Sequence, residues 1–255
     1  MHVIVVHHPK DASTAQVQSL ADAMGITAID ARQRLVCPSP VVVSVLADRQ
    51  QAQKPLCELR RSGLEAFLVD VEAALSQRPV FVVRSFSFAD NVMHVRDGQG
   101  RDAAIGNQEI KLILSATQMR GQTEVQTVTE RKFSVGRTLM AGGLPLSKKT
   151  TRQETLAVEE REQVLYLCSG KGSRLICARD RMTYEGFGDA MKPSREMNHN
   201  LFVNRVRQRC PEALYDDRLM RRAAQVQLLG PLLDPDRYLE LAVDILLTTL
   251  VLRRE

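Results

Sequence analysis

The hydrophobic pattern at the start of the chain changes from the period of a strand to that of a helix. Val3–Val6 is a run of β-branched and aliphatic residues, which is typical of a buried strand. Between Val17 and Met24, apolar residues recur at three- and four-residue intervals and so share one helical face. Ser13 precedes this stretch as a suitable N-cap, and Gly25 follows it at the usual C-terminal glycine position. The pattern predicts a strand followed by a helix.

The next residues extend this alternation of strands and helices. Thr27 can cap a second, shorter helix, and Val41–Leu46 is a second buried strand. Asp48 can cap a third helix that ends near Arg61, and the segment 64–69 reads as a third strand. The predicted order is strand, helix, helix, strand, helix, strand.

This order resembles the C-terminal domain of the bacterial ribosomal stalk protein and the related Clp protease adaptor fold. The local matches are the opening strand Val3-Ile4-Val5-Val6, the turn Met24-Gly25-Ile26 before Asp30-Ala31-Arg32, and the ending Leu59-Arg60-Arg61-Ser62-Gly63-Leu64-Glu65-Ala66. The stalk family has a glycine-led turn, a short "eAk" helix and an "L-x-x-A-G-A-x-V" ending at these places. The sequence departs from the family on its factor-binding face, because the second helix offers only Arg32 and Arg34 instead of a set of lysines. The resemblance therefore implies the fold and leaves translation-factor binding in doubt.

From Val80 onward the pattern becomes that of short strands separated by turns. A helix capped by Ser194 and ending near Arg209 follows them. Strands are predicted at 80–88, 92–95, 103–105, 110–114 and 122–133, with a hairpin at 164–168 and 175–178 across the turn 169–172.

Six or seven strands closed by one helix resemble a bacterial pleckstrin-homology-like domain. The resemblance implies an antiparallel barrel or sandwich, and it implies a partner-binding role because such domains usually bind phosphoinositides, peptides or proteins. The predicted fold class is therefore α+β. Its parts are a small stalk-like domain at 1–70, a short helical linker at 71–78, the β-rich domain at 79–210 and a helical tail at 211–255.

The tail is predicted to hold two helices, capped by Asp217 and Asp234. The last helix runs from Pro235 to about Leu252 and is apolar on most sides, so something must cover it. Packing within the chain's own core is the favoured interpretation. A homodimer that joins two copies along this helix is the alternative.

Positive charge is concentrated in one segment of this 255-residue chain. Between Gln118 and Gln153 there are seven basic and two acidic residues, and this excess equals the formal net charge of +5. A localised basic segment predicts an anionic partner. The stretch 132–149 within this segment contains three glycines, which permit a tight or mobile backbone, and several apolar residues.

We therefore predict that this segment is the contact surface of a non-enzymatic adaptor or scaffold protein. The partner would be a protein or an anionic membrane surface, and the alternative is nucleic acid bound by the same bases. A hairpin that folds its apolar residues back on the sheet, with no partner, is the plainer interpretation. The candidate binding residues are Arg131, Lys132, Arg137, Lys148, Lys149 and Arg152 for charge, and Leu139, Met140, Leu144 and Leu146 for apolar anchoring.

No linear motif for catalysis or for metal binding is present. The five cysteines are odd in number and form no C-x-x-C pair, which argues against disulfide frameworks and zinc ribbons. The chain lacks H-E-x-x-H, G-x-S-x-G, S-x-x-K and P-loop patterns. No motif links His199 to Cys168 or Cys210 as a nucleophile pair. The sequence thus predicts no cofactor and no metal, and an enzyme assembled from distant residues is the remaining alternative.

The expected compartment is the cytoplasm. The N-terminus has a short apolar run without a cationic leader, so it does not read as a signal peptide. The apolar run at 241–252 contains Asp244 and is shorter than the ~20 residues that cross a membrane.

Overall fold

The computed structural model of the chain describes residues 1–7, 12–76, 80–133, 147–170 and 172–252, with the backbone alone at 120–133, 147–160 and 252. The chain divides into two compact units, Met1–Gln118 with Glu162–Glu255, and Met119–Arg161. We call the first unit the body. The predicted boundaries near 70, 79 and 210 all fall inside the body, and the domain division that they imply stays a prediction.

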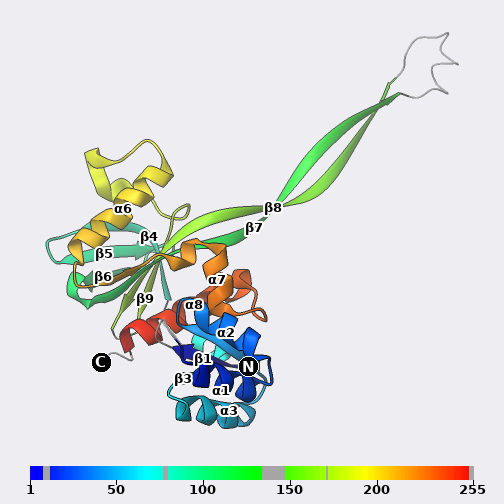
Figure 1. Cartoon of the computed structure of the whole chain (residues 1–255). Coiled ribbons are helices and arrows are strands. Elements are labelled where there is room, and N and C mark those ends of the chain that lie inside the picture. The colour runs from blue at the N-terminus through cyan, green and yellow to red at the C-terminus, as the bar shows by residue number, and fades with distance from the viewer. Residues whose placement is uncertain (8–11, 77–79, 134–146, 171, 253–255) are drawn as a thin grey trace. The chain divides into compact units, whose positions relative to one another are not determined.

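The small sheet of the body has three strands in the order β2-β1-β3, and both pairings are antiparallel. The element order of this region confirms the one predicted from the sequence (Figure 1). The strands are β1 (His2–His7), β2 (Val41–Leu46) and β3 (Glu65–Asp70), and the helices are α1 (Thr14–Met24), α2 (Ala28–Val36) and α3 (Arg49–Arg61).

Local hydrogen bonds fix the ends of these helices where the sequence placed them. Ser13 and Gln16 form a capping box, in which each side chain accepts a hydrogen bond from the backbone N–H of the other residue. The side chain of Thr27 accepts from the backbone N–H of Asp30 at 3.1 Å. Gly25 ends α1 with φ of 63°, a left-handed conformation that glycine adopts without a steric penalty.

The large sheet has seven strands in the order β10-β7-β8-β9-β4-β5-β6. Its pairs β10–β7 and β4–β9 are parallel, so the sheet is mixed and the predicted antiparallel sheet is wrong in this respect. No barrel closes among the described strands, because β10 and β6 stand at opposite ends of the order. The strands are β4 (Val80–Phe88), β5 (Val92–Asp97), β6 (Asp102–Gly106), β7 (Ile110–Phe133), β8 (Ser147–Ser169), β9 (Arg174–Ala178) and β10 (Leu214–Asp216).

The other elements follow the sequence with three corrections. The segment 211–255, predicted to be helical, also contains strand β10, which pairs with β7. The two strands predicted at 110–114 and 122–133 are parts of the single strand β7. Asp217 precedes a 3₁₀ turn at Arg218–Met220, and the helix that it was expected to cap begins later, at Arg222. The helices are α4 (Val71–Ser76), α6 (Arg195–Arg209), α7 (Arg222–Leu229) and α8 (Pro235–Leu247), with further 3₁₀ turns at Asn107–Glu109 and Glu185–Ala190 and a π-helical turn at Thr248–Leu252.

Helix α8 lies in the core between the two sheets of the body. Strand β1 directs Ile4 and Val6 into a cluster with α1, α2 and α3, and it directs Val3 and Val5 into the cluster that holds α8. The same α8 cluster contains Leu112 and Tyr166 among other large-sheet residues. The apolar side chains of α8 are therefore covered within one copy of the chain, and the homodimer seam stays a prediction.

A buried charged network fastens α8 to the large sheet. Arg174 of β9 is 3% exposed and forms ion pairs with Glu240 and Asp244 on α8. The hydroxyl of Tyr166 on β8 donates to Glu240 at 2.8 Å. Because a buried charge is costly without its partner, this guanidinium and the Asp244 carboxylate depend on each other.

We predict that Arg174→Met destabilises the protein by about 3–5 kcal/mol, because it removes the guanidinium from the buried Asp244 carboxylate. Unfolding in urea, followed by circular dichroism, measures the loss. The double variant Arg174→Met/Asp244→Leu should recover much of that stability, since no buried charge is then left unpaired at this pair. Equal stability of the single variant and the natural protein would contradict the role given to the ion pair.

Candidate functional site

The predicted binding residues fall on strands β7 and β8 and on the segment between them. Arg131 and Lys132 belong to β7, and Lys148, Lys149 and Arg152 belong to β8. The structure describes the backbone of these five residues and not their side chains. The other predicted residues, Arg137, Leu139, Met140, Leu144 and Leu146, lie outside the described residues.

The described backbone gives this region the form of a two-stranded ribbon. Strand β7 has 24 residues and β8 has 23, whereas each of the other strands has between 3 and 9. The pairing of β7 with β10 covers Leu112–Leu114, and that of β8 with β9 covers Val164–Cys168. Beyond these pairings the two strands have each other as neighbours, and Figure 1 shows them twisting about one another. We call the segment 118–153 the basic ribbon.

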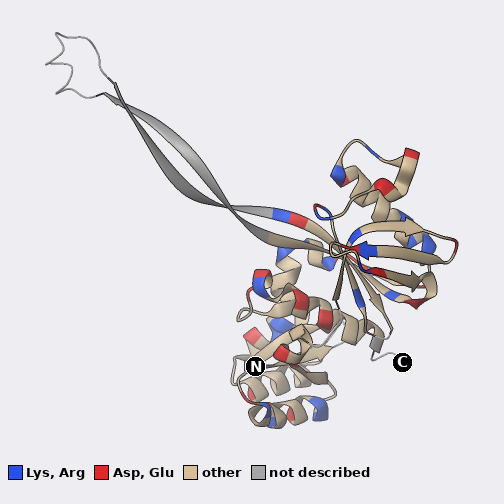
Figure 2. Ribbon diagram, turned by 180° about the vertical axis from the view of Figure 1, so that it is seen from behind, with Lys and Arg blue, Asp and Glu red and all other residues tan. Residues whose placement is uncertain are grey.

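Charge is more evenly balanced in the body, which has 27 basic and 25 acidic residues. Outside 118–153 as a whole, the chain has equal numbers of basic and acidic residues. Figure 2 shows the two signs interspersed over the described residues of the body. Several of them form ion pairs with each other, as Arg96 does with Asp102 and Arg222 with Asp236. An anionic partner that recognises charge therefore has the ribbon as its distinctive target.

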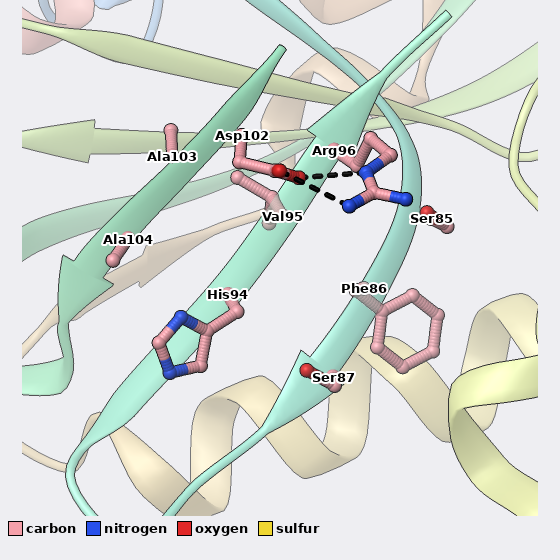
Figure 3. Close-up of a pocket in the computed structure, with 9 residues that line it drawn as sticks. All are labelled: Ser85, Phe86, Ser87, His94, Val95, Arg96, Asp102, Ala103 and Ala104. Carbon is pink, nitrogen blue, oxygen red and sulfur yellow. Dashed lines mark hydrogen bonds and ion pairs between the residues drawn. The ribbon is translucent and has the colours of Figure 1, made fainter. Parts of the chain in front are cut away.

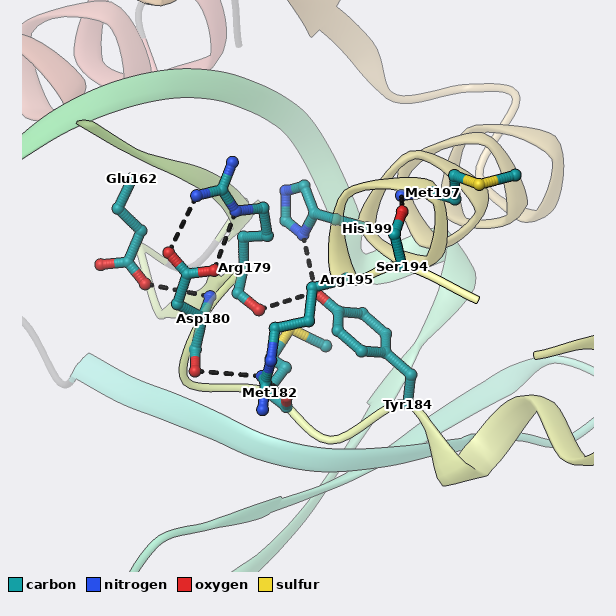
Figure 4. A network of polar contacts seen from close by, with 9 residues as sticks. All are labelled: Glu162, Arg179, Asp180, Met182, Tyr184, Ser194, Arg195, Met197 and His199. Atoms are coloured by element: carbon teal, nitrogen blue, oxygen red, sulfur yellow. Dashed lines mark hydrogen bonds and ion pairs between the residues drawn. The ribbon is translucent and has the colours of Figure 1, made fainter. Parts of the chain in front are cut away.

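A partly buried polar network joins the turn after β9 to helix α6 (Figure 4). The hydroxyl of Tyr184 donates to the backbone oxygen of Arg179 at 3.0 Å and lies 3.2 Å from Nδ1 of His199. Because the tyrosine proton is used on Arg179, we assign the proton of that second contact to Nδ1 of His199. Arg195 of α6 donates to the backbone oxygens of Asp180 and Met182, at 3.2 and 3.1 Å. These bonds hold the turn against α6.

The carboxylate of Glu162 completes this network from strand β8. Glu162 is 1% exposed, and its Oε1 accepts from the backbone N–H of Asp180 at 3.1 Å. Its Oε2 is buried without a hydrogen-bond partner in the structure. Asp180 in turn makes a two-pronged ion pair with Arg179, at 2.9 and 3.0 Å. The network ties together residues that are far apart in sequence.

Burial keeps His199, Tyr184 and the Cys177 thiol neutral. Desolvation, helped by the positive charge of Arg179, lowers the pKa of His199 to about 4. Desolvation raises the pKa of Tyr184 and also that of the Cys177 thiol. His199 is therefore uncharged near neutral pH, and Cys177 is a thiol and not the nucleophilic thiolate. The network supports the turn after β9 structurally. It could not be predicted from a sequence motif, because its members come from separate elements.

The described residues contain no group of three or more His, Cys, Asp and Glu side chains arranged to hold a metal ion. None of the helices in this part of the chain has the length and apolar character required to cross a bilayer.

The low pKa of His199 predicts that the protein loses stability as the pH falls from 6.5 towards 4. Between pH 6.5 and 4 His199 is protonated in the unfolded chain but not in the folded chain. The contribution of the neutral imidazole to stability is therefore complete above pH 6.5 and is lost by pH 4. A shift from 6.5 to about 4 corresponds to about 3 kcal/mol. Urea unfolding at pH 7 and pH 4.5 measures this difference.

The variant His199→Gln should flatten that pH dependence, since it keeps a polar side chain beside Tyr184 without a titrating imidazole. The control is His94→Gln, because His94 is exposed on β5 and should leave the dependence unchanged. An unchanged slope in the His199 variant would show that the buried imidazole is not the source.

Comparison with known proteins assigns the chain to no family. No protein-family model, no curated protein and no solved structure matches the chain. The resemblance to the stalk domain therefore rests on the order of elements and the short local matches, and the resemblance to pleckstrin-homology-like domains rests on the order of elements alone.

Proposed function

We propose that this chain is a non-enzymatic adaptor or scaffold protein that binds an anionic partner, a protein or a membrane surface, through the basic ribbon. The observation that carries the proposal is the separation of charge. The ribbon holds seven bases against two acids, and the rest of the chain balances to zero. The residues Met119–Arg161 also form a compact unit distinct from the body.

The form of the ribbon supports a contact role. A two-stranded ribbon is marginally stable by itself in water, because it has no further strand or helix on which to pack an apolar face. Contact with a partner would therefore add to its stability. A dense set of bases also accelerates encounter with an anionic surface and orients the approach.

The non-enzymatic character is inferred from how the body uses its reactive residue types. His199 and Tyr184 hold each other inside the core, and Cys177 is fully buried. The sequence also contains no linear catalytic motif that would indicate another role for these residues. All five cysteines are free thiols, which fits the proposed cytoplasmic location.

The finer fold resemblances are part of this proposal. The antiparallel small sheet with its three helices supports a stalk-like fold for 1–70. Helix α6, which packs Phe202 and Val206 against β4 and β5 residues in one core cluster, supports a pleckstrin-homology-like plan for 79–210. That plan would be an open and mixed version of the fold, given the parallel pairs of the large sheet.

The test is capture of crosslinked partners from lysate, with and without nuclease. We expect the triple variant Lys148→Gln/Lys149→Gln/Arg152→Gln to lose a partner that survives nuclease in the natural protein. The matched control is Lys54→Gln/Arg61→Gln/Lys192→Gln, which removes the same charge from exposed positions of the body and should keep the partner. Equal capture by both variants would contradict a contact made by the ribbon.

Nucleic acid is the second candidate, and the two-stranded form of the ribbon favours it. The major groove of B-DNA admits a two-stranded β-ribbon. Phe133 is the only aromatic residue in 118–153, so base stacking would be minor and contacts would go mainly to the phosphates.

This second candidate predicts affinity for duplex DNA that falls steeply with salt, with a slope set by the number of phosphates neutralised. Fluorescence anisotropy of a labelled duplex at several salt concentrations measures it. The ribbon variant should show a shallower slope than the body variant. Absence of binding to duplex and to single strands at low salt would remove this candidate.

A further inference from the structure

The outer face of strands β4, β5 and β6 presents two rows of polar and small side chains. Ser85 pairs with Arg96 across β4 and β5, and Arg96 pairs with Asp102 across β5 and β6. The neighbouring row consists of Ser87, His94 and Ala104 in the same order. Successive side chains of a strand alternate between faces, so residues two apart share one face.

The opposite face of these strands is occupied by the core. Phe86 of β4, Met93 of β5 and Ile105 of β6 belong to the cluster that packs against α6. The outer rows are therefore free of core packing, and a hollow lies over them. This cavity has a volume of about 590 Å³ and includes both serines, His94, Arg96 and Asp102 in its lining (Figure 3). Its volume falls in the range of small-molecule sites, about 300–1,000 Å³.

Hydrogen-bond donors converge on this hollow from two strands. Opposed residues of neighbouring strands stand about 5 Å apart, and residues two apart on one strand stand about 7 Å apart. The Cβ atoms of Ser85, Ser87, His94 and Arg96 thus mark the corners of a small rectangle, from which their polar side chains rise on the outer face. An anion with several terminal oxygens, such as a phosphate group, can accept hydrogen bonds from more of these corners than a planar carboxylate can.

The ion pair on β5 and β6 holds the guanidinium in place for such a role. Nε of Arg96 donates to Oδ1 of Asp102 at 2.7 Å, and Nη2 donates to Oδ2 at 3.0 Å. This two-pronged pair fixes the plane of the guanidinium and leaves Nη1 for another acceptor. In Figure 3 that remaining nitrogen lies on the side of Ser85.

We propose that this cavity, which we call the sheet-face pocket, binds the phosphate group of a small molecule. Nη1 of Arg96 is the principal donor, the hydroxyls of Ser85 and Ser87 and the ring of His94 supply further hydrogen bonds, and Asp102 is a positioning residue for Arg96. The inference is independent of the basic ribbon, because every residue it uses belongs to the body.

The test is titration with inorganic phosphate at constant ionic strength, with chloride as the compensating ion. Nuclear magnetic resonance follows the backbone amides, so that binding at the pocket is read separately from binding elsewhere. We expect saturable shifts that centre on Ser85, Ser87, His94 and Arg96. The Arg96→Gln variant should weaken binding by about tenfold or more, since it removes the charged donor.

Two variants provide the controls. Arg222→Gln breaks a comparable exposed ion pair with Asp234 and Asp236 and should leave the phosphate response unchanged. The ribbon variant Lys148→Gln/Lys149→Gln/Arg152→Gln should also keep it, which separates this inference from the proposed function. Shifts that grow linearly without saturation, or an equal response in Arg96→Gln and the natural protein, would overturn the proposal.

A phosphate group can belong to a soluble metabolite or to a lipid, and a second arm distinguishes the two sources. Vesicles of phosphatidylcholine with phosphatidic acid are sedimented with the ribbon variant, so that the ribbon's own bases do not dominate. Co-sedimentation that Arg96→Gln abolishes would identify a lipid phosphate. Saturable binding of inorganic phosphate without co-sedimentation would identify a soluble phosphate ester.

Discussion

The body of this protein depends on the burial of one helix between two sheets. Helix α8 supplies residues such as Leu241 and Ile245 to a cluster that also takes Val3 from the small sheet and Leu112 from the large sheet. Arg174 reaches this helix from β9 and pairs with Asp244 inside the core. The hydrophobic contacts are non-directional, whereas the ion pair specifies which strand faces which turn of the helix. The last helix of the chain thereby joins its first strand to its central sheet.

The groups that stabilise the body differ from those that we propose to contact a partner. The body uses its aromatic and titratable groups internally, as Tyr184 and His199 show by holding the turn after β9 against α6. Its charges of both signs are interspersed, while the segment 118–153 carries seven bases against two acids. A body with charges of both signs and a basic ribbon is the basis of the proposed role as a binding protein.

The sequence predicted the parts of the fold that local chemistry determines. Ser13, Thr27, Asp48 and Ser194 all cap the helices expected of them, because a cap needs only its own neighbours. The sheet order was not predictable in the same way. The alternation of β4 and β9 shows that each is a strand, but it does not show that they pair in parallel across more than ninety residues.

The basic ribbon and the sheet-face pocket also differ in how far each could be predicted from the sequence. The basic ribbon is a local concentration of charge, so it could be predicted directly from the sequence. The sheet-face pocket depends on the register that sets Ser85 opposite Arg96 and Ser87 opposite His94, with a bulge between Val83 and Ser85. No linear pattern encodes that register, because a shift by one residue would turn every side chain to the other face.

The most direct test of the account is the salt concentration at which the protein elutes from a polyanionic heparin column. The ribbon variant Lys148→Gln/Lys149→Gln/Arg152→Gln and the body variant Lys54→Gln/Arg61→Gln/Lys192→Gln have the same net charge and differ in where the charge was removed. The account predicts that the ribbon variant elutes at clearly lower salt, while the body variant elutes with the natural protein. Elution of the two variants at the same salt would show that net charge alone governs binding, and it would contradict a contact surface located on the ribbon.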